Sequence, residues 1–211
     1  MSISYESTGR TRQKARTRDA IIAATRELLA ADGTATVEEA ADAAGVSRAT
    51  AYRYFPNRRD LLVATHPEID AQSLLGTDPP DDVAERLDLV VDEVARMVIE
   101  NEPELRTMLR LSLDPEDTHR DQLVLRQGRV IGWLDDALQE LRGTIPRAEL
   151  RRLVYAIRCA VGIEALVWLC DVAGLSRGEA VEVMRWSARG LLRSALADGS
   201  ASEGRARRSR N

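Results

Sequence analysis

The sequence predicts an all-α protein in which a small helix-turn-helix domain precedes a larger helical domain, with about nine helices in total. Apolar residues recur at helical spacing through most of the 211 residues. No segment alternates apolar and polar residues for more than a few positions, so strands are not expected. Glycine, proline and capping residues fall where these helices would begin or end.

Composition divides the chain into four regions. We expect a disordered arm at 1–11, the helix-turn-helix domain at 12–65, the larger helical domain at 66–198 and a disordered tail at 199–211. The tail is rich in Ser, Gly and Arg and cannot bury an apolar core.

The segment from Thr36 to Leu62 has the pattern of a helix, a tight turn and a second short helix. Thr36 and Glu39 have the spacing of a capping box, which starts the first helix. Gly45 ends that helix, because glycine adopts a left-handed backbone without strain. Ser47 then caps the second helix. The inward positions of this unit carry small or apolar residues, which are Ala40, Ala41, Ala44, Val46, Ala51 and Phe55.

Other helices are placed by the same signals. One is expected over 12–32, and the spacing of Asn57 and Asp60 predicts another that runs to about Thr65. Residues 66–80, rich in Gly, Asp and Pro, form an irregular connection. Five helices of the larger domain are expected at about 82–100, 103–113, 118–142, 146–173 and 176–197.

The net charge of −4 is unevenly distributed. Residues 1–60 carry ten basic and eight acidic side chains, whereas residues 61–198 carry sixteen basic and twenty-five acidic ones. A basic head on an acidic body is typical of a protein that touches DNA at one end only.

The outward positions of 36–62 carry hydroxyl and guanidinium groups, which bind phosphates and base edges. A helical hairpin with a solvated basic face would share any one of these features. Their combination, closed by Tyr-Arg-Tyr-Phe-Pro, indicates instead a unit that reads DNA.

From about Arg16 to Leu62 the sequence resembles the amino-terminal domain of the tetracycline-repressor (TetR) family of bacterial regulators. The rest of the chain matches that family only in helical character and length. The resemblance implies a homodimer that binds a palindromic double-stranded DNA operator and is released by a small-molecule effector. The matching residues are Ala44-Gly45-Val46-Ser47, Thr50, Tyr52, Tyr54-Phe55-Pro56 and Leu61-Leu62.

Under this resemblance, Arg48 and Arg53 are expected to read bases, because the guanidinium fork matches guanine O6 and N7. Ala49 and Thr50 are short enough to let the helix approach, and either methyl group could touch thymine. The remaining expected DNA contacts, mainly to phosphates or the minor groove, are Thr36, Ser47, Tyr52, Tyr54, Arg58, Arg12, Lys14 and Arg16.

The resemblance also implies an effector pocket among the helices of the larger domain. Glu164 lies in an apolar segment and needs a partner, which could be Arg129, Arg158, Arg189 or a cationic ligand. For each apolar candidate, plain core packing is the alternative. The candidate pocket residues are Met97, Met108, Trp133, Ile163, Glu164, Val167 and Trp168.

The last helix carries an apolar stripe. Together with the helix before it, this stripe could pack against the same two helices of a second copy and form a four-helix bundle across a twofold axis. The alternative is that both helices fill the core of one chain. The candidate interface residues are Val181, Met184, Ala188, Leu191, Leu192 and Ala195.

Other function classes find little support in the sequence. No metal cluster, phosphate-binding Gly loop or nucleophile beside a histidine is evident, so we expect no enzyme, cofactor or metal. Residues 153–170 come closest to a membrane span, but Arg158 and Glu164 interrupt them. A cytoplasmic, nucleoid-associated protein is expected. The alternatives are a helical ligand-binding protein and a DNA-architectural protein without effector response.

Overall fold

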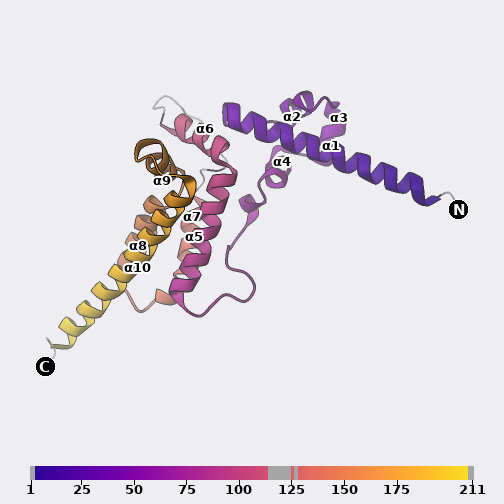
Figure 1. Ribbon diagram of the computed structural model, residues 1–211. Helices are drawn as coiled ribbons and strands as arrows, with labels where there is room; N and C mark the ends of the chain where they lie inside the picture. The colour runs from indigo at the N-terminus through magenta and orange to yellow at the C-terminus, as the bar shows by residue number, and fades with distance from the viewer. Residues whose placement is uncertain (1–2, 114–124, 126–127, 209–211) are drawn as a thin grey trace. The chain divides into compact units, whose positions relative to one another are not determined.

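The computed structural model describes residues 3–113, 125 and 128–208 (Figure 1). Within this part of the chain every regular secondary-structure element is a helix, which confirms the all-α prediction. The chain forms two compact units. The first comprises Met1–Ala71 and Pro103–Gln127, and the second Gln72–Glu102 and Gly128–Asn211.

The first unit begins with a long helix, α1, that starts earlier than the sequence suggested. It runs from Ile3 instead of about Arg12, so helix replaces most of the expected disordered arm. Once a helix is nucleated, each further residue adds one hydrogen bond, and no proline opposes extension here. The other elements are α2 (Val37–Ala43), α3 (Arg48–Tyr54), α4 (Arg58–Thr65), η1 (Pro67–Asp70) and α6 (Glu102–Ser112).

The caps of α2 and α3 are those that the sequence predicts. The Thr36 hydroxyl accepts a hydrogen bond from the Glu39 amide at 3.2 Å, and the Glu39 carboxylate accepts one from the Thr36 amide at 2.8 Å. Gly45 adopts a φ of 66°, in the left-handed region that favours glycine. Ser47 caps α3 by accepting a hydrogen bond from the Thr50 amide at 3.2 Å.

Two apolar clusters hold the first unit together. In one, α1, α2, α3 and α4 contribute the buried residues Ile21, Val37, Ala40, Ala41, Ala51, Phe55 and Leu61. The other joins Leu29, Ala35 and Leu62 to Met108 of α6. Met108 therefore belongs to the core of the first unit. This packing explains why Pro103–Gln127 falls with α1–α4, although the sequence analysis placed it in the larger domain.

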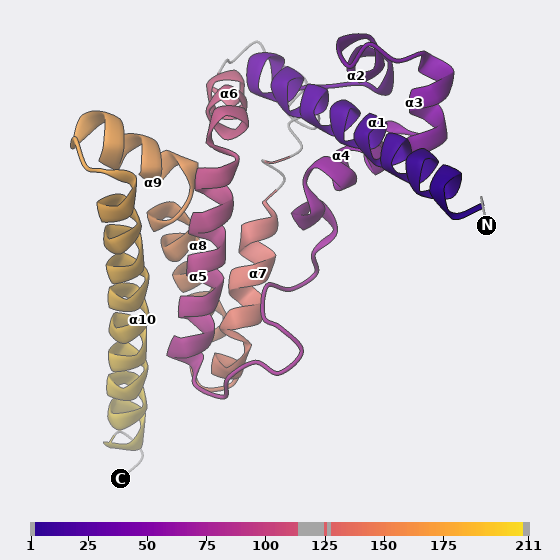
Figure 2. The same cartoon turned by 45° about the vertical axis from the view of Figure 1, so that its right-hand side comes forward.

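The second unit is a bundle in which α10 packs on α5 and α8, while α7 packs on the same two helices (Figure 2). The expected helix at 118–142 corresponds here to α7, which starts after Gly128 at a φ of 76°; residues 114–124 and 126–127 lie outside the described part. The elements are α5 (Val83–Glu100), α7 (Arg129–Ala137), η4 (Gln139–Leu141), α8 (Arg147–Ala160), α9 (Ile163–Val167), η5 (Trp168–Val172) and α10 (Arg177–Arg208).

The helix expected at 146–173 is broken between α8 and α9. Gly162 has a φ of 130°, which side chains other than glycine rarely adopt. The Arg158 guanidinium stabilises the break, because its Nη1 donates to the Val161 carbonyl at 3.0 Å and pairs with Glu164 Oε2 at 3.2 Å. A β-carbon on residue 162 would lie 2.6 Å from that nitrogen.

This same stretch, Arg147–Val172, is long and apolar enough to cross a membrane by length and composition alone, with a mean hydropathy of 1.8 over an 18-residue window. A core helix of a soluble protein passes the same test. Here the stretch is interrupted at Gly162, and α8 buries Leu153, Val154 and Ile157 inside the second unit. Its apolar character therefore has a sufficient explanation in packing.

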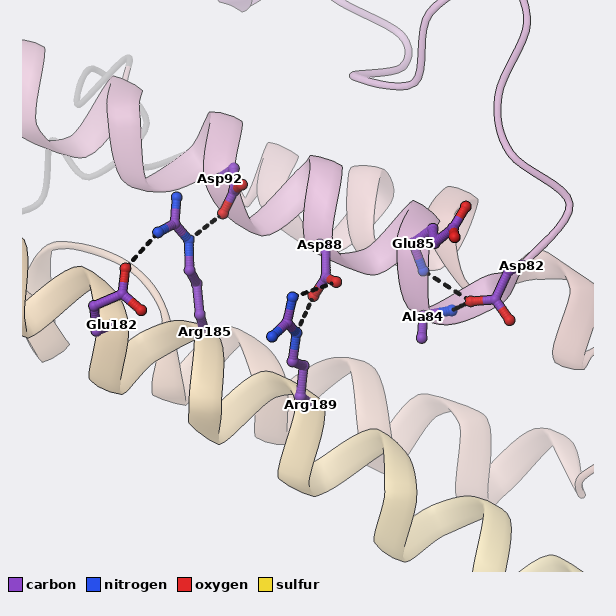
Figure 3. Close-up of polar contacts among 8 residues, drawn as sticks. All are labelled: Asp82, Ala84, Glu85, Asp88, Asp92, Glu182, Arg185 and Arg189. Atoms are coloured by element: carbon purple, nitrogen blue, oxygen red, sulfur yellow. Dashed lines mark hydrogen bonds and ion pairs between the residues drawn. The ribbon is translucent and has the colours of Figure 1, made fainter.

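Ion pairs connect α5 and α10 along their exposed edge (Figure 3). Arg189 donates from Nε and Nη2 to the two oxygens of Asp88, both at 2.7 Å. Arg185 donates to Asp92 and, at 2.6 Å, to Glu182. These contacts raise the pKa values of both arginines. They align α10 with α5, but solvent screens them and limits their contribution to stability.

The stripe assigned to a dimer interface is largely internal. Met184, Ala188 and Leu192 are buried within the single chain, where α10 packs on α5 and α8. Val181, Leu191 and Ala195 are half-buried. Over residues 177–197 of α10, the large apolar side chains that are exposed are Val183 and Trp186. α10 itself continues to Arg208, into the region expected to be disordered.

Candidate nucleic-acid interface

Helix α3 presents one side to solvent and packs the other into the first unit. Ala51 is fully buried, and Phe55, which ends the helix, is nearly so. Arg48, Ala49 and Arg53 are exposed, as expected for residues that approach DNA. Of the other expected contacts on this helix, Ser47 and Tyr52 are exposed, while Thr50 and Tyr54 are half-buried.

The hydroxyl groups at the start of α3 are already engaged. Ser47 Oγ and Thr50 Oγ1 lie 2.9 Å apart and share a hydrogen bond. Ser47 also caps the helix through the Thr50 amide. The pair therefore fixes the beginning of α3, and the neighbouring Arg48 and Ala49 project from a rigid first turn.

Two carboxylates of α2 face the donors of α3. Glu38 Oε1 accepts a short hydrogen bond from the Tyr52 hydroxyl. Asp42, four residues later, lies 4.0 Å from Nη2 of Arg48, and both of these side chains are about two-thirds exposed. The Tyr52 hydrogen bond lowers the pKa of Glu38, and the same bond raises the pKa of Tyr52.

Sequence reasoning missed Glu38 and Asp42 as parts of this surface. Their signal was an i, i+4 pair of carboxylates on α2, which by spacing alone reads as a solvated face. Only the crossing of α2 and α3 shows that this face lies against Arg48 and Tyr52.

Two arginines stack on aromatic rings of the unit. The guanidinium carbon of Arg53 lies 5.7 Å from the centre of the Tyr54 ring, and that of Arg18 lies 5.7 Å from the centre of the Phe55 ring. Both distances fall in the range of cation–π attraction. Arg53 remains exposed, so stacking orients its fork without removing it from the surface.

Arg58 has a different position from the one expected of a phosphate contact. Its Nε donates to the Ala35 carbonyl at 2.9 Å, and its Nη2 donates to the Thr34 hydroxyl at 3.0 Å. The half-buried guanidinium thus supports the loop that leads to Thr36 and α2. Its side chain holds the unit together rather than extending from it.

The basic residues before the helix-turn-helix lie on α1 and not on a disordered arm. Arg12, Lys14 and Arg16 are exposed there. On a helix, Arg12 and Arg16 are four residues apart and share a face, while Lys14 points elsewhere. A continuous helix restricts how these three residues can follow one DNA strand.

The expected effector residues are not all brought together. Met97, Trp133 and Ile163 are buried in the second unit, and Val167 is half-buried. Met108 is buried in the first unit, as described above. Trp168 is 59% exposed, so it does not line an enclosed pocket.

Glu164 has the partner that one of the sequence alternatives proposed. It pairs with Arg158, across the break between α8 and α9. Its side chain is 39% exposed, so this carboxylate is not buried as the apolar surroundings in the sequence suggested.

The first unit is thus a helix-turn-helix domain whose second helix exposes guanidinium, hydroxyl and small groups, the arrangement of a DNA-binding protein. Residues 21–65 match the bacterial regulatory proteins of the tetR family. Residues 21–65 therefore form a domain of the kind found in the tetR family of bacterial regulatory proteins.

Comparison with whole proteins adds a structural neighbour. No curated protein matches the chain. Among solved structures, the chain is similar to a TetR-family transcriptional regulator from Streptomyces coelicolor, with 22% sequence identity and a TM-score of 0.49. The similarity covers 92% of this chain and 88% of that chain.

Proposed function

We propose that the protein is a homodimeric one-component regulator that represses transcription by binding a palindromic operator and is released by a small molecule. It acts in the cytoplasm, on the nucleoid, as a binding protein and not as an enzyme. The observation that carries the proposal is the exposed face of α3, with Arg48, Ala49 and Arg53 available to a major groove.

The dimer follows from the small size of that face. α3 has only seven residues, and one such helix offers little surface for tight specific binding. Two copies related by a twofold axis would place two α3 helices in successive major grooves, about 34–36 Å apart, on a palindromic site.

The surface that we assign to the dimer lies on α8 and α10 of the second unit. Trp186 is 71% exposed, and Val183 lies three residues away on the same stripe of α10. On α8, Tyr155 is exposed beside an open groove of about 560 Å³ that also includes Cys159. We propose that these side chains form one surface when two copies meet, since a contiguous exposed apolar patch marks an interaction site.

The effector site is proposed within the second unit. The residues retained from the sequence analysis are Met97, Trp133, Ile163, Val167 and Glu164. The Arg158–Glu164 pair supports this assignment, because it places two charged groups at the break between α8 and α9, next to the buried Ile163. A polar ligand could exchange with either partner.

Selection of bound duplexes from a random pool tests this proposal. We expect a palindromic site, and we expect Arg48→Ala or Arg53→Ala to relax the preference at one position per half-site by about 1–3 kcal/mol. Removing Arg12 and Lys14 should instead weaken binding to all DNA alike. Sedimentation of a monomer that binds a non-palindromic site with full affinity would contradict the proposal.

A further inference from the structure

The hydrogen bond between Glu38 and Tyr52 fixes which way the Tyr52 hydroxyl group points its proton on the exposed face of the helix-turn-helix. A phenol has one proton to donate and oxygen lone pairs that accept. Here the Tyr52 proton is committed to Oε1 of Glu38. Tyr52 is 40% exposed, so a partner from outside can reach its oxygen. What the hydroxyl offers to that partner is an acceptor.

The direction of this proton disfavours a phosphate as the partner of Tyr52. A phosphate oxygen only accepts hydrogen bonds, so Tyr52 would have to release Glu38 in order to donate to it. Both acceptors are charged, so the exchange replaces one strong hydrogen bond by another of similar strength. It also leaves the Glu38 carboxylate without its donor, beside a second negative charge. The hydrogen bond with Tyr52 and the nearby charge of Arg48 both lower the pKa of Glu38, so the repelling charge is present at neutral pH.

A base amino group is the complementary partner. In the major groove, the only strong donors on base edges are N4 of cytosine and N6 of adenine. Either can donate to the Tyr52 oxygen while the Tyr52 proton stays on Glu38. Guanine and thymine present only acceptors at the corresponding edge. They would place an acceptor against the Tyr52 oxygen, which is also an acceptor, so no hydrogen bond could form.

We propose that Glu38 and Tyr52 form an acceptor pair that selects cytosine or adenine at one position of each half-site. Tyr52 makes the contact, and Glu38 is a positioning residue that fixes the direction of the hydroxyl. The inference rests on the proposed function, in that α3 enters the major groove. It replaces the expectation that Tyr52 binds a phosphate.

The test is selection from a random duplex pool with the full-length protein and three variants. Wild type should enrich adenine or cytosine at one position per half-site. In Tyr52→Phe that preference should fall by about two- to twelve-fold, the range for one hydrogen bond, while all other positions keep theirs. Glu38→Ala removes the acceptor and frees the Tyr52 proton, so preference at the same position should shift toward guanine or thymine. Tyr54→Phe is the control: it removes an expected phosphate contact, so it should weaken binding to all duplexes alike and leave the base preference at this position intact.

Several outcomes would overturn the inference. Tyr52→Phe could keep every base preference and bind all duplexes more weakly by one factor, which is the behaviour of a phosphate contact. Glu38→Ala could leave the Tyr52-dependent position unchanged, and then Glu38 would have no positioning role. A wild-type protein that selects a site with no Tyr52-dependent position would overturn the inference alone. A wild-type protein that enriches no sequence would overturn the proposed function as well.

Discussion

Arg58 supports the loop that precedes the helix-turn-helix. Its hydrogen bonds to Thr34 and Ala35 tie the start of α4 to the loop before α2. Arg58→Ala should therefore lower the free energy of unfolding by about 1–2 kcal/mol, as measured by urea denaturation, because hydrogen bonds from a charged donor are lost. Arg59→Ala is the control. Arg59 is 69% exposed and pairs with Asp70 at the surface, so its loss should change stability by less than about 0.5 kcal/mol.

The same Arg58 variant distinguishes a structural role of Arg58 from a direct contact with a DNA phosphate. A residue that neutralises a phosphate changes the salt dependence of DNA binding by about 0.9 in log–log slope. We expect Arg58→Ala to leave the slope unchanged. A reduced slope with normal stability would make Arg58 a phosphate ligand after all.

Because of the hydrogen bond between Glu38 and Tyr52, we expect the free energy of unfolding to depend on pH both below and above neutrality. The pKa of Glu38 is lowered from 4.5, so its contribution to stability is present above that pH and is lost as the pH falls through the lower folded-state value. The pKa of Tyr52 is raised from 10.0, so the corresponding contribution is present below pH 10 and is lost as the pH rises through the higher folded-state value.

Absorbance titration of the phenols measures this directly. The difference between wild type and Tyr52→Phe isolates the Tyr52 titration, which should fall above pH 10. In the Glu38→Ala background the Tyr52 phenol should ionise at a lower pH, because the carboxylate that accepts its proton and repels the phenolate is gone. Identical titrations in the two backgrounds would show that the hydrogen bond is absent in solution.

At the scale of elements, the sequence predicted local structure where the signal is local. The caps at Thr36, Ser47 and Asn57 depend on neighbouring residues three positions apart, and all three are present in the structure. The break at Gly162 could not be predicted this way. It sits in an apolar run of helical character, and Arg158 and Glu164 stabilise it through side-chain contacts across the turn.

The glycines at positions 162 and 190 should respond in opposite ways to alanine. Gly162→Ala should destabilise the protein by about 1–3 kcal/mol, because residue 162 has a φ of 130° and its β-carbon would meet the Arg158 guanidinium. Gly190→Ala should stabilise it by about 0.5–1 kcal/mol, because residue 190 lies inside α10 and its β-carbon would meet nothing closer than 4.0 Å. Thermal unfolding of both variants checks this, and equal effects would contradict the described break.

At the scale of the whole molecule, the sequence predicted which helices exist better than which of their faces meet. The stripe of Met184, Ala188 and Leu192 is an apolar face, as the sequence predicted, and within the single chain it is buried where α10 packs on α5 and α8. Helical periodicity identifies a buried side, and it cannot tell a core within one chain from an interface between two. The same ambiguity placed Met108 in the larger domain, although it packs on Leu29 and Leu62.

The exposed aromatic residue of α10 provides the test of assembly. Trp186→Glu leaves the core of the single chain intact, because Trp186 is 71% exposed. If Trp186 is buried between two copies, the new carboxylate must lose its hydration there, and self-association should weaken at least tenfold, or about 1.4 kcal/mol. Sedimentation velocity at micromolar concentration would then show monomers, and operator affinity should fall with the loss of the second α3.

A matched control is available on α5. Leu89 is also apolar and 49% exposed, but it lies outside the α8 and α10 surface that we assign to the dimer. Leu89→Glu should keep both the dimer and the operator affinity. If Leu89→Glu dissociates the dimer and Trp186→Glu does not, the twofold axis passes by α5. The two copies of α3 would then be held together through a different face of the second unit.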